Sequence, residues 1–157
     1  FDTKLKIIMK SKKLIIATLM IISIASFTSC KKEKIKGCKT SYATNYKSDA
    51  EEDDGSCTYE SKIIFWQNQA NAASWSAAGV TALTFYVDGQ LIGSCAANVY
   101  NSSTPTCGGG GQASTTKSMG TSATKSVSYS IKDQTGYEWY TGNISLDGSS
   151  CSVQQFN

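Results

Sequence analysis

Apolar and polar positions alternate in short runs through the C-terminal two thirds of the chain. The segment LTFYVD (83–88) alternates with a period of two, the pattern of a half-buried strand. Asp88-Gly89 follows it and favours a tight hairpin, because primed turns need positive φ at both central positions. We therefore expect a hairpin whose returning strand covers residues 90–93.

The rest of this region repeats the same kind of pattern. Further strands are expected at 63–66, 126–132, 137–146 and from Cys151 onward, with turns at 133–136 and at Asp147-Gly148. Residues 67–79 form a loop or a short helical turn, and 112–125 form a loop or a polar edge strand. Short strands separated by their own turn residues predict a mainly β fold, a small antiparallel β-sandwich over residues 60–157.

The first 29 residues have a different pattern. Lys10, Lys12 and Lys13 precede an apolar stretch at 14–25, which ends in small polar residues. This stretch is shorter than the roughly 20 apolar residues of a spanning helix. We therefore expect residues 1–29 to be a signal peptide with an apolar helix, and translation to start at Met9.

The segment SFTSC (26–30) resembles the lipobox of bacterial lipoproteins. The resemblance implies cleavage after Ser29 and lipidation of Cys30 with fatty acids such as palmitate. The alternative is an ordinary signal peptide whose Cys30 joins a disulfide. On the lipoprotein interpretation, residues 30–36 are a Lys-rich tether, the membrane is a partner through the lipid, and the protein faces the periplasm or the cell surface from the outer membrane.

The charged residues of the chain exclude several classes of functional site and partner. The chain has no Arg and no His, so it cannot form a Ser-His-Asp system, a His-ligated zinc site or an Arg clamp on phosphate. From Cys30 onward, ten Lys stand against eleven Asp and Glu, a net charge of −1. A nucleic-acid-binding domain would need a basic face, so we expect no nucleic-acid partner.

Residues 37–59 have a motif of their own. They resemble the GC…A.NY…A…DDGSC.Y module of secreted proteins, notably lipoproteins of the Bacteroidota, through Gly37-Cys38, Asn45-Tyr46 and the DDGSC run at 53–57. An exported protein meets an oxidising compartment, so Cys38 and Cys57 should pair. Such a bridge would restrain a segment too polar to form a core of its own.

This module is acidic. Its carboxylates at Asp49, Glu51, Asp53 and Asp54, together with Glu52, suggest a calcium site, because calcium takes clustered oxygen ligands around a tight turn. Their spacing is not that of an EF-hand. The alternative is a solvated acidic turn with Asp54-Gly55 at its corner, and no other cofactor is expected.

The β-domain also carries a resemblance. The segments YVDGQLIG (86–93), 137–147 and 151–156 are similar to small β-domains of Bacteroidota lipoproteins and, more loosely, to PEGA-type and transthyretin-like surface modules. The resemblance implies a disulfide between Cys107 and Cys151, with Cys95 unpaired and inert. Proximity in sequence favours Cys95 with Cys107 instead, and both pairings stay open at this point.

These patterns predict a non-catalytic binding or adhesion module for carbohydrate or an envelope protein. Aromatic residues suited to such contacts are numerous, and an exposed coplanar row would favour binding. The members of this set are Trp66, Trp75, Tyr86, Tyr100, Tyr137, Trp139 and Tyr140. The alternatives are a structural accessory subunit of an envelope complex and a glycosidase using Asp133 and Glu138.

Overall fold

The computed structural model describes residues 32–157, and everything below concerns that part of the chain. The predicted signal peptide, its cleavage site at Ser29 and the predicted lipid site at Cys30 lie outside the described residues. Residues 34–157 form one compact unit. Within the described residues, no helix is long and apolar enough to cross a membrane.

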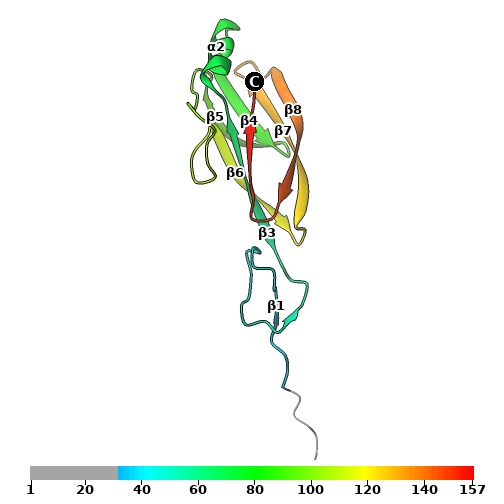
Figure 1. The fold of residues 1–157 in the computed structure, drawn as a ribbon. Helices are drawn as coiled ribbons and strands as arrows, with labels where there is room; N and C mark the ends of the chain where they lie inside the picture. Colours follow the sequence, from blue (N-terminus) through cyan, green and yellow to red (C-terminus); the bar gives the residue numbers. More distant parts are fainter. Residues whose placement is uncertain (1–31) are drawn as a thin grey trace, which may run out of the picture. The chain divides into compact units, whose positions relative to one another are not determined.

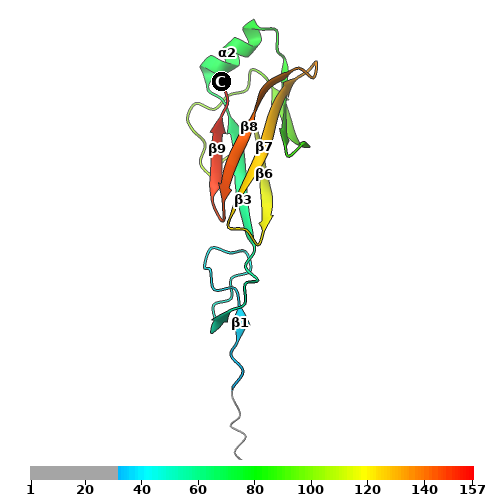
Figure 2. The same cartoon turned by 90° about the vertical axis from the view of Figure 1, so that its right-hand side faces the viewer.

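The unit is mainly β, with two sheets that make a small sandwich (Figures 1 and 2), as predicted. One sheet has the strand order β6-β3-β9, formed by Ala113–Gly120, Tyr59–Trp66 and Cys151–Gln155. The other has the order β5-β4-β7-β8, formed by Gln90–Ala96, Ala82–Val87, Thr124–Asp133 and Glu138–Asp147.

The predicted hairpin joins β4 to β5. Asp88 and Gly89 at its corner have φ of 49° and 72°, the positive values that the turn type requires. The Asp88 carboxylate adds two contacts: it accepts from the Ser128 backbone N–H at 3.0 Å and pairs with the Lys117 ammonium at 3.2 Å. The turn therefore also connects β4 to β6 and β7.

Three elements differ from or refine the expected pattern. Strand β9 runs parallel to β3, whereas the other strand pairs of the sandwich are antiparallel. Residues 67–79, expected to form a loop or a short helical turn, contain helix α2, Gln69–Ala77, which begins after the N-cap Asn68. The Ser- and Thr-rich segment forms β6 at the edge of its sheet, where its alternate side chains face water.

The core lies between the two sheets. Phe65 on β3 contacts Phe85 on β4 at 5.6 Å and Tyr129 on β7 at 5.5 Å between ring centroids. Phe85 also contacts Phe156, just beyond β9, at 5.3 Å. Burying each such side chain stabilises the fold by roughly 1.5–3 kcal/mol. The other buried residues include Ile63, Leu83, Val87, Val127, Ile131, Ile144 and Leu146.

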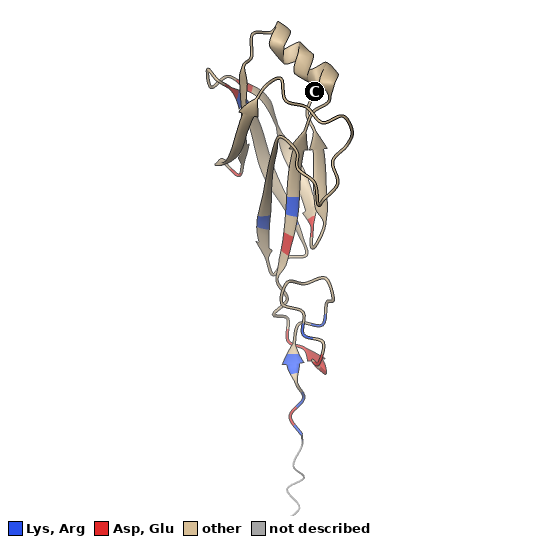
Figure 3. Cartoon of the chain, turned by 90° about the vertical axis from the view of Figure 1, so that its left-hand side faces the viewer, with Lys and Arg blue, Asp and Glu red and all other residues tan. Residues whose placement is uncertain are grey.

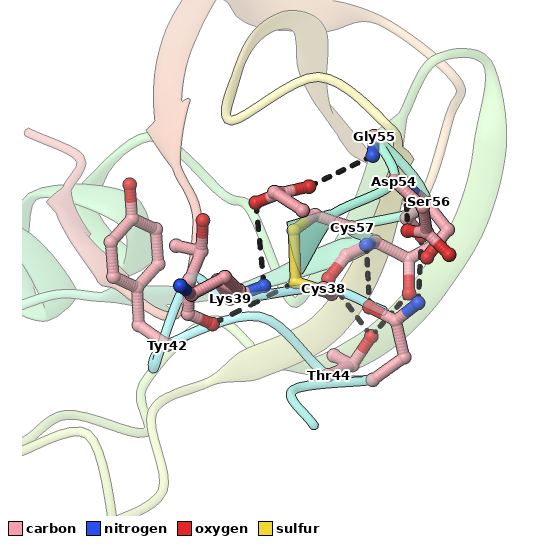
Figure 4. Close-up of a disulfide and its surroundings, with 12 residues drawn as sticks. Cys38, Lys39, Tyr42, Thr44, Asp54, Gly55, Ser56 and Cys57 are labelled. Atoms are coloured by element: carbon pink, nitrogen blue, oxygen red, sulfur yellow. Dashed lines mark hydrogen bonds between the residues drawn. A yellow bond between two sulfur atoms is a disulfide. The ribbon is translucent and has the colours of Figure 1, made fainter. Parts of the chain in front are cut away.

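The Cys38–Cys57 disulfide is present (Figure 4), with both residues almost fully buried. Around it, the Asn45 side chain donates to the Ser56 carbonyl and accepts from the Thr58 N–H, so the Asn45 of the motif connects the interior of the loop to the segment around Cys57. Two short parallel strands, β1 (Lys36–Gly37) and β2 (Glu52–Asp53), complete the module. Strand β3 continues directly out of it at Tyr59.

A buried glutamine connects the sheet to the helix and to the long loop. Gln67 follows β3 and is fully buried. Its amide nitrogen donates to the carbonyls of Ala97 and Val99 at 2.8 and 2.7 Å, and its amide oxygen accepts from the Trp75 indole at 2.7 Å. Both amide hydrogens and the amide oxygen of this side chain are therefore hydrogen-bonded.

The backbone of Gln67 is bonded as well. Its N–H donates to the Gln112 side chain at 2.8 Å, and its carbonyl accepts from the Asn101 N–H at 2.9 Å. Gln112 also donates to the Asn101 side chain. One residue therefore fixes α2 and both ends of the loop 97–112 to the end of β3.

We predict that Gln67→Leu destabilises the protein by about 3 kcal/mol or more. The substitution leaves two carbonyls and one indole N–H without partners in a buried place, and each orphaned group costs about 1–3 kcal/mol. Urea unfolding measures the change. Gln90→Leu is the matched control, because Gln90 is exposed, and it should unfold like the wild type. Equal stability of the two variants would show that Gln67 is not the connecting residue.

Candidate functional site

A groove between α2 and the start of β8 is the best-formed candidate site. It has a volume of about 210 Å³ and is lined by Asn71, Ser74, Trp75, Ala78, Trp139, Tyr140 and Asn157. Figures 1 and 2 show why the lining comes from distant parts of the sequence: α2 lies beside the end of β9. The Asn71 amide joins these two elements by donating to the Phe156 carbonyl at 2.8 Å.

Helix geometry gathers one wall of the groove. Asn71 precedes Ser74 and Trp75 by three and four residues, and these two precede the C-cap Ala78 by four and three, so the four positions share a face of α2. The helix begins where the Asn68 side chain accepts from the Asn71 N–H at 3.0 Å. The indole of Trp75 is locked by its bond to Gln67, and only 5% of this residue is exposed.

A carboxylate positions the opposite wall. Asp133, at the end of β7, accepts at one oxygen from the N–H and hydroxyl of Thr135 and from the N–H of Tyr137. Its other oxygen accepts from the Trp139 indole at 2.9 Å. This carboxylate closes the turn into β8 and fixes the Trp139 ring, which is 38% exposed.

The aromatic rings at the groove form a corner. Trp75 and Trp139 are 5.1 Å apart at an interplanar angle of 84°, and Tyr137 meets Trp139 at 5.2 Å and 76°. Tyr140 meets Trp75 at 5.9 Å and 87°. The coplanar row that would have favoured binding is therefore not formed by these four residues.

The remaining aromatics of the predicted set are dispersed. Trp66 is buried at the end of β3, whereas Tyr86 is half-buried and lies under the Lys132 ammonium at 5.4 Å from its ring centroid. Tyr100 is 44% exposed in the loop after β5. Sequence reasoning named all the aromatic members of the groove, but it had no signal for Asn71 or Ser74.

The groove itself has no charged side chain in its lining. Helix α2 contains no charged residue (Figure 3), and none of the groove-lining residues is Lys, Asp or Glu. A second hollow of about 380 Å³ lies beside α2 and is lined by Ser76, Gly79, Val80, Thr81, Ala96 and Asn98. That lining has no aromatic or ionisable side chain. The groove of Trp75 and Trp139, which has aromatic and polar side chains, is therefore the better candidate for ligand binding.

Asp133 and Glu138, the two carboxylates of the glycosidase alternative, each contact neighbouring protein groups. The Thr135 hydroxyl is the largest cause lowering the pKa of Asp133 to about 2; loss of surrounding water opposes it, and the Trp139 indole adds to the lowering. Glu138 pairs with Lys132 at 3.8 Å. A carboxylate held ionised in this way is poorly suited to donate a proton to a glycosidic oxygen.

The predicted calcium site stays a prediction for the residues described here. Among them, no group of three acidic or cysteine side chains is placed to hold a metal ion. The carboxylates of Asp53 and Asp54 instead accept backbone hydrogens: Asp53 from Lys39 and Gly55, and Asp54 from Ser56 (Figure 4). Glu52 pairs with Lys36 at 3.8 Å, and Asp49 and Glu51 are exposed. These contacts fit the alternative of an acidic turn with Asp54-Gly55 at its corner.

The three cysteines of the β-domain are thiols in the structure, so neither proposed second disulfide is formed there. Cys95 lies opposite Leu83 in the β4–β5 register and packs against the core. Burial raises the pKa of its thiol to about 11, as expected for an inert thiol. Cys107 is exposed and Cys151 is half-buried at the start of β9.

Comparison with protein-family models, with curated proteins and with solved structures finds no match.

The Asp133–Trp139 contact predicts a pH dependence. Because folding lowers the Asp133 pKa from its ordinary 3.8 to about 2, the stabilising contribution of the ionised carboxylate is complete above about pH 4 and is lost as the pH falls through about 2. The Trp139 indole N–H resonance in NMR spectra should titrate with a midpoint near pH 2.

The Trp75 indole is an internal control for this titration, because its partner Gln67 carries no charge and its resonance should stay unchanged. Asp133→Asn should abolish the Trp139 titration. A midpoint near pH 4 in the wild type would mean that the carboxylate is not held by these hydrogen bonds.

Proposed function

We propose that this protein is a non-catalytic binding module that takes a neutral carbohydrate in the groove of Trp75 and Trp139. In this proposal a lipid on Cys30 holds it at the cell envelope, on the outer membrane, facing the periplasm or the cell surface. The single observation that carries the binding function is a groove without charged side chains that combines aromatic walls with amide and hydroxyl groups.

The aromatic walls favour a ligand with apolar C–H faces. An aromatic ring carries partial negative charge on its face, which attracts C–H groups, and it offers a large apolar area at low entropic cost. Trp75 and Trp139 are each held by an indole hydrogen bond, so their rings are in place before a ligand arrives. Such preorganisation reduces the entropy lost on binding.

The polar members favour a ligand with hydroxyl groups. Asn71 donates one amide hydrogen to Phe156, and its side-chain oxygen accepts no hydrogen bond among the described residues. Ser74 donates to the Ala70 carbonyl at 2.9 Å, which leaves its oxygen able to accept. These groups can accept from hydroxyls of a bound sugar, and no charged side chain lines the groove to favour an ionised ligand.

The size and shape of the groove limit which ligands it can hold. A volume of about 210 Å³ is below the roughly 300–1,000 Å³ of pockets for drug-sized ligands. Because the rings meet nearly at right angles, they suit one sugar ring or the end of a chain better than a flat crystalline polymer. A terminal monosaccharide unit is therefore the proposed contact.

A glycan array probed with the full chain in detergent tests the proposal. We expect binding to neutral glycans and a loss of affinity of at least tenfold, about 1.4 kcal/mol, for Trp139→Ala. Tyr100→Ala is the matched control, because Tyr100 is similarly exposed but outside the groove, and it should bind like the wild type.

Circular dichroism of both variants checks that they fold. Absence of any bound glycan, or equal binding by Trp139→Ala, would reject the carbohydrate function and favour the structural accessory subunit of an envelope complex instead.

The lipid anchor has its own test. Cells expressing the protein and fed a radioactive fatty acid should label the wild type and leave Cys30→Ser unlabelled, while both are exported. An unlabelled wild type, or a label that survives Cys30→Ser, would reject lipidation at this residue without touching the carbohydrate proposal.

A further inference from the structure

Three aromatic rings form a connected series that becomes more exposed from the groove toward the turn into β8. Trp75 is 5% exposed, Trp139 is 38% exposed and Tyr137 is 63% exposed. The Trp139 ring contacts each of the other two, at 5.1 and 5.2 Å between ring centroids. The aromatic surface therefore continues from the buried wall of the groove to a ring that is not part of its lining.

The backbone of Tyr137 is fixed, whereas its side chain is free. The Tyr137 N–H donates to the Asp133 carboxylate at 3.1 Å, and its carbonyl accepts from the Asp133 N–H at 3.0 Å. Within residues 32–157, the phenolic hydroxyl has no hydrogen-bond partner and Trp139 is the one ring that Tyr137 contacts. Closing the turn therefore uses the backbone of Tyr137 and not its ring.

The exposed rings of Trp139 and Tyr137 offer the same chemistry as the groove. Their faces attract C–H groups, and the free hydroxyl of Tyr137 can donate to and accept from sugar hydroxyls. The Asp133 carboxylate holds both residues, because it accepts from the Trp139 indole at 2.9 Å as well as from the Tyr137 N–H. The two residues are therefore held by one group before a ligand arrives, which reduces the entropy lost on binding.

The other boundaries of the groove offer no comparable surface. Asn71 donates to the Phe156 carbonyl, and the Tyr140 hydroxyl donates to the Asn157 carbonyl, so residues 156 and 157 are bonded to both walls. The second hollow beside α2 has no aromatic side chain in its lining. A ligand longer than the groove therefore finds its next aromatic contact at Tyr137.

We infer that the binding site extends beyond the groove and takes a second sugar unit on the exposed ring of Tyr137, so that the ligand is a neutral oligosaccharide of at least two units. The inference rests on the carbohydrate function proposed above, because it concerns a second unit of the same ligand. Trp139 contacts both units, the terminal one in the groove and the next one beside Tyr137. The bonds of a glycosidic linkage rotate, so consecutive units can lie against rings that meet at 76°.

The test compares three probes taken from one glycan, the neutral glycan that binds best on the array. The probes are the methyl glycoside of its terminal sugar, its terminal disaccharide and its terminal trisaccharide. Each probe is titrated into the isotope-labelled full chain in detergent. The indole N–H resonances of Trp75 and Trp139 in NMR spectra report binding at the groove.

We expect the disaccharide to bind the wild type at least about fivefold more tightly than the methyl glycoside, because it adds the contact with Tyr137. The trisaccharide should bind like the disaccharide, since no further ring of residues 32–157 contacts Tyr137. Tyr137→Ala should bind the methyl glycoside like the wild type and lose the gain from the second unit. Tyr137→Phe keeps the ring and should keep most of that gain, whereas Trp139→Ala should weaken binding of all three probes.

Tyr100→Ala is the matched control, because Tyr100 is exposed but outside the groove, and it should bind all three probes like the wild type. Three outcomes would overturn the inference and leave the carbohydrate function standing. They are a disaccharide that binds no more tightly than the methyl glycoside, a gain that survives Tyr137→Ala, and an equal loss for both probes in Tyr137→Ala. Absence of binding by every glycan and probe would reject the carbohydrate function, and the inference with it.

Discussion

The hydrogen bonds of one buried amide hold together the end of the sandwich that carries α2. Gln67 accepts from the indole that forms the inner wall of the groove and donates to two carbonyls of the loop that leads to Cys107. A glutamine in a core is costly unless every polar atom is paired, and here every one is. The groove and the loop therefore share one support, although they lie on different elements.

The sequence predicted the strands whose side chains alternate and whose turns have a specific chemistry. The β4–β5 hairpin is the clearest case, since Asp88-Gly89 tolerates the positive φ values found there. Helix α2 was harder to predict because only Ala72 and Trp75 of its residues are buried, so it has almost no apolar stripe. The parallel pairing of β9 was not predictable locally, because it depends on a partner far away in the sequence.

The candidate site was predicted only in part, and for a common physical reason. A carboxylate beside a tight turn can accept hydrogen bonds from backbone N–H groups, and the order of acidic residues along the chain does not reveal which carboxylates do so. Asp53 closes the turn at Gly55 in this way, and Asp133 closes the turn into β8 while holding Trp139. The sequence pattern also does not predict that the Gln67 amide holds Trp75, because a single glutamine after a strand usually faces water.

The parallel pairing of β3 with β9 has a consequence for how the chain reaches its fold. Ser61 and Ser150, which are bonded at 3.2 Å, are 89 residues apart in sequence. A chain that emerges N-terminus first, from a ribosome or an export channel, must keep one edge of β3 unpaired until residue 155 is out. Such distant contacts slow folding and leave a strand edge open to wrong partners. Strand β6 precedes β9 in the chain and can pair with the other edge of β3 first. Because β6 is rich in Ser and Thr, the partly formed sheet then has a polar strand at that edge.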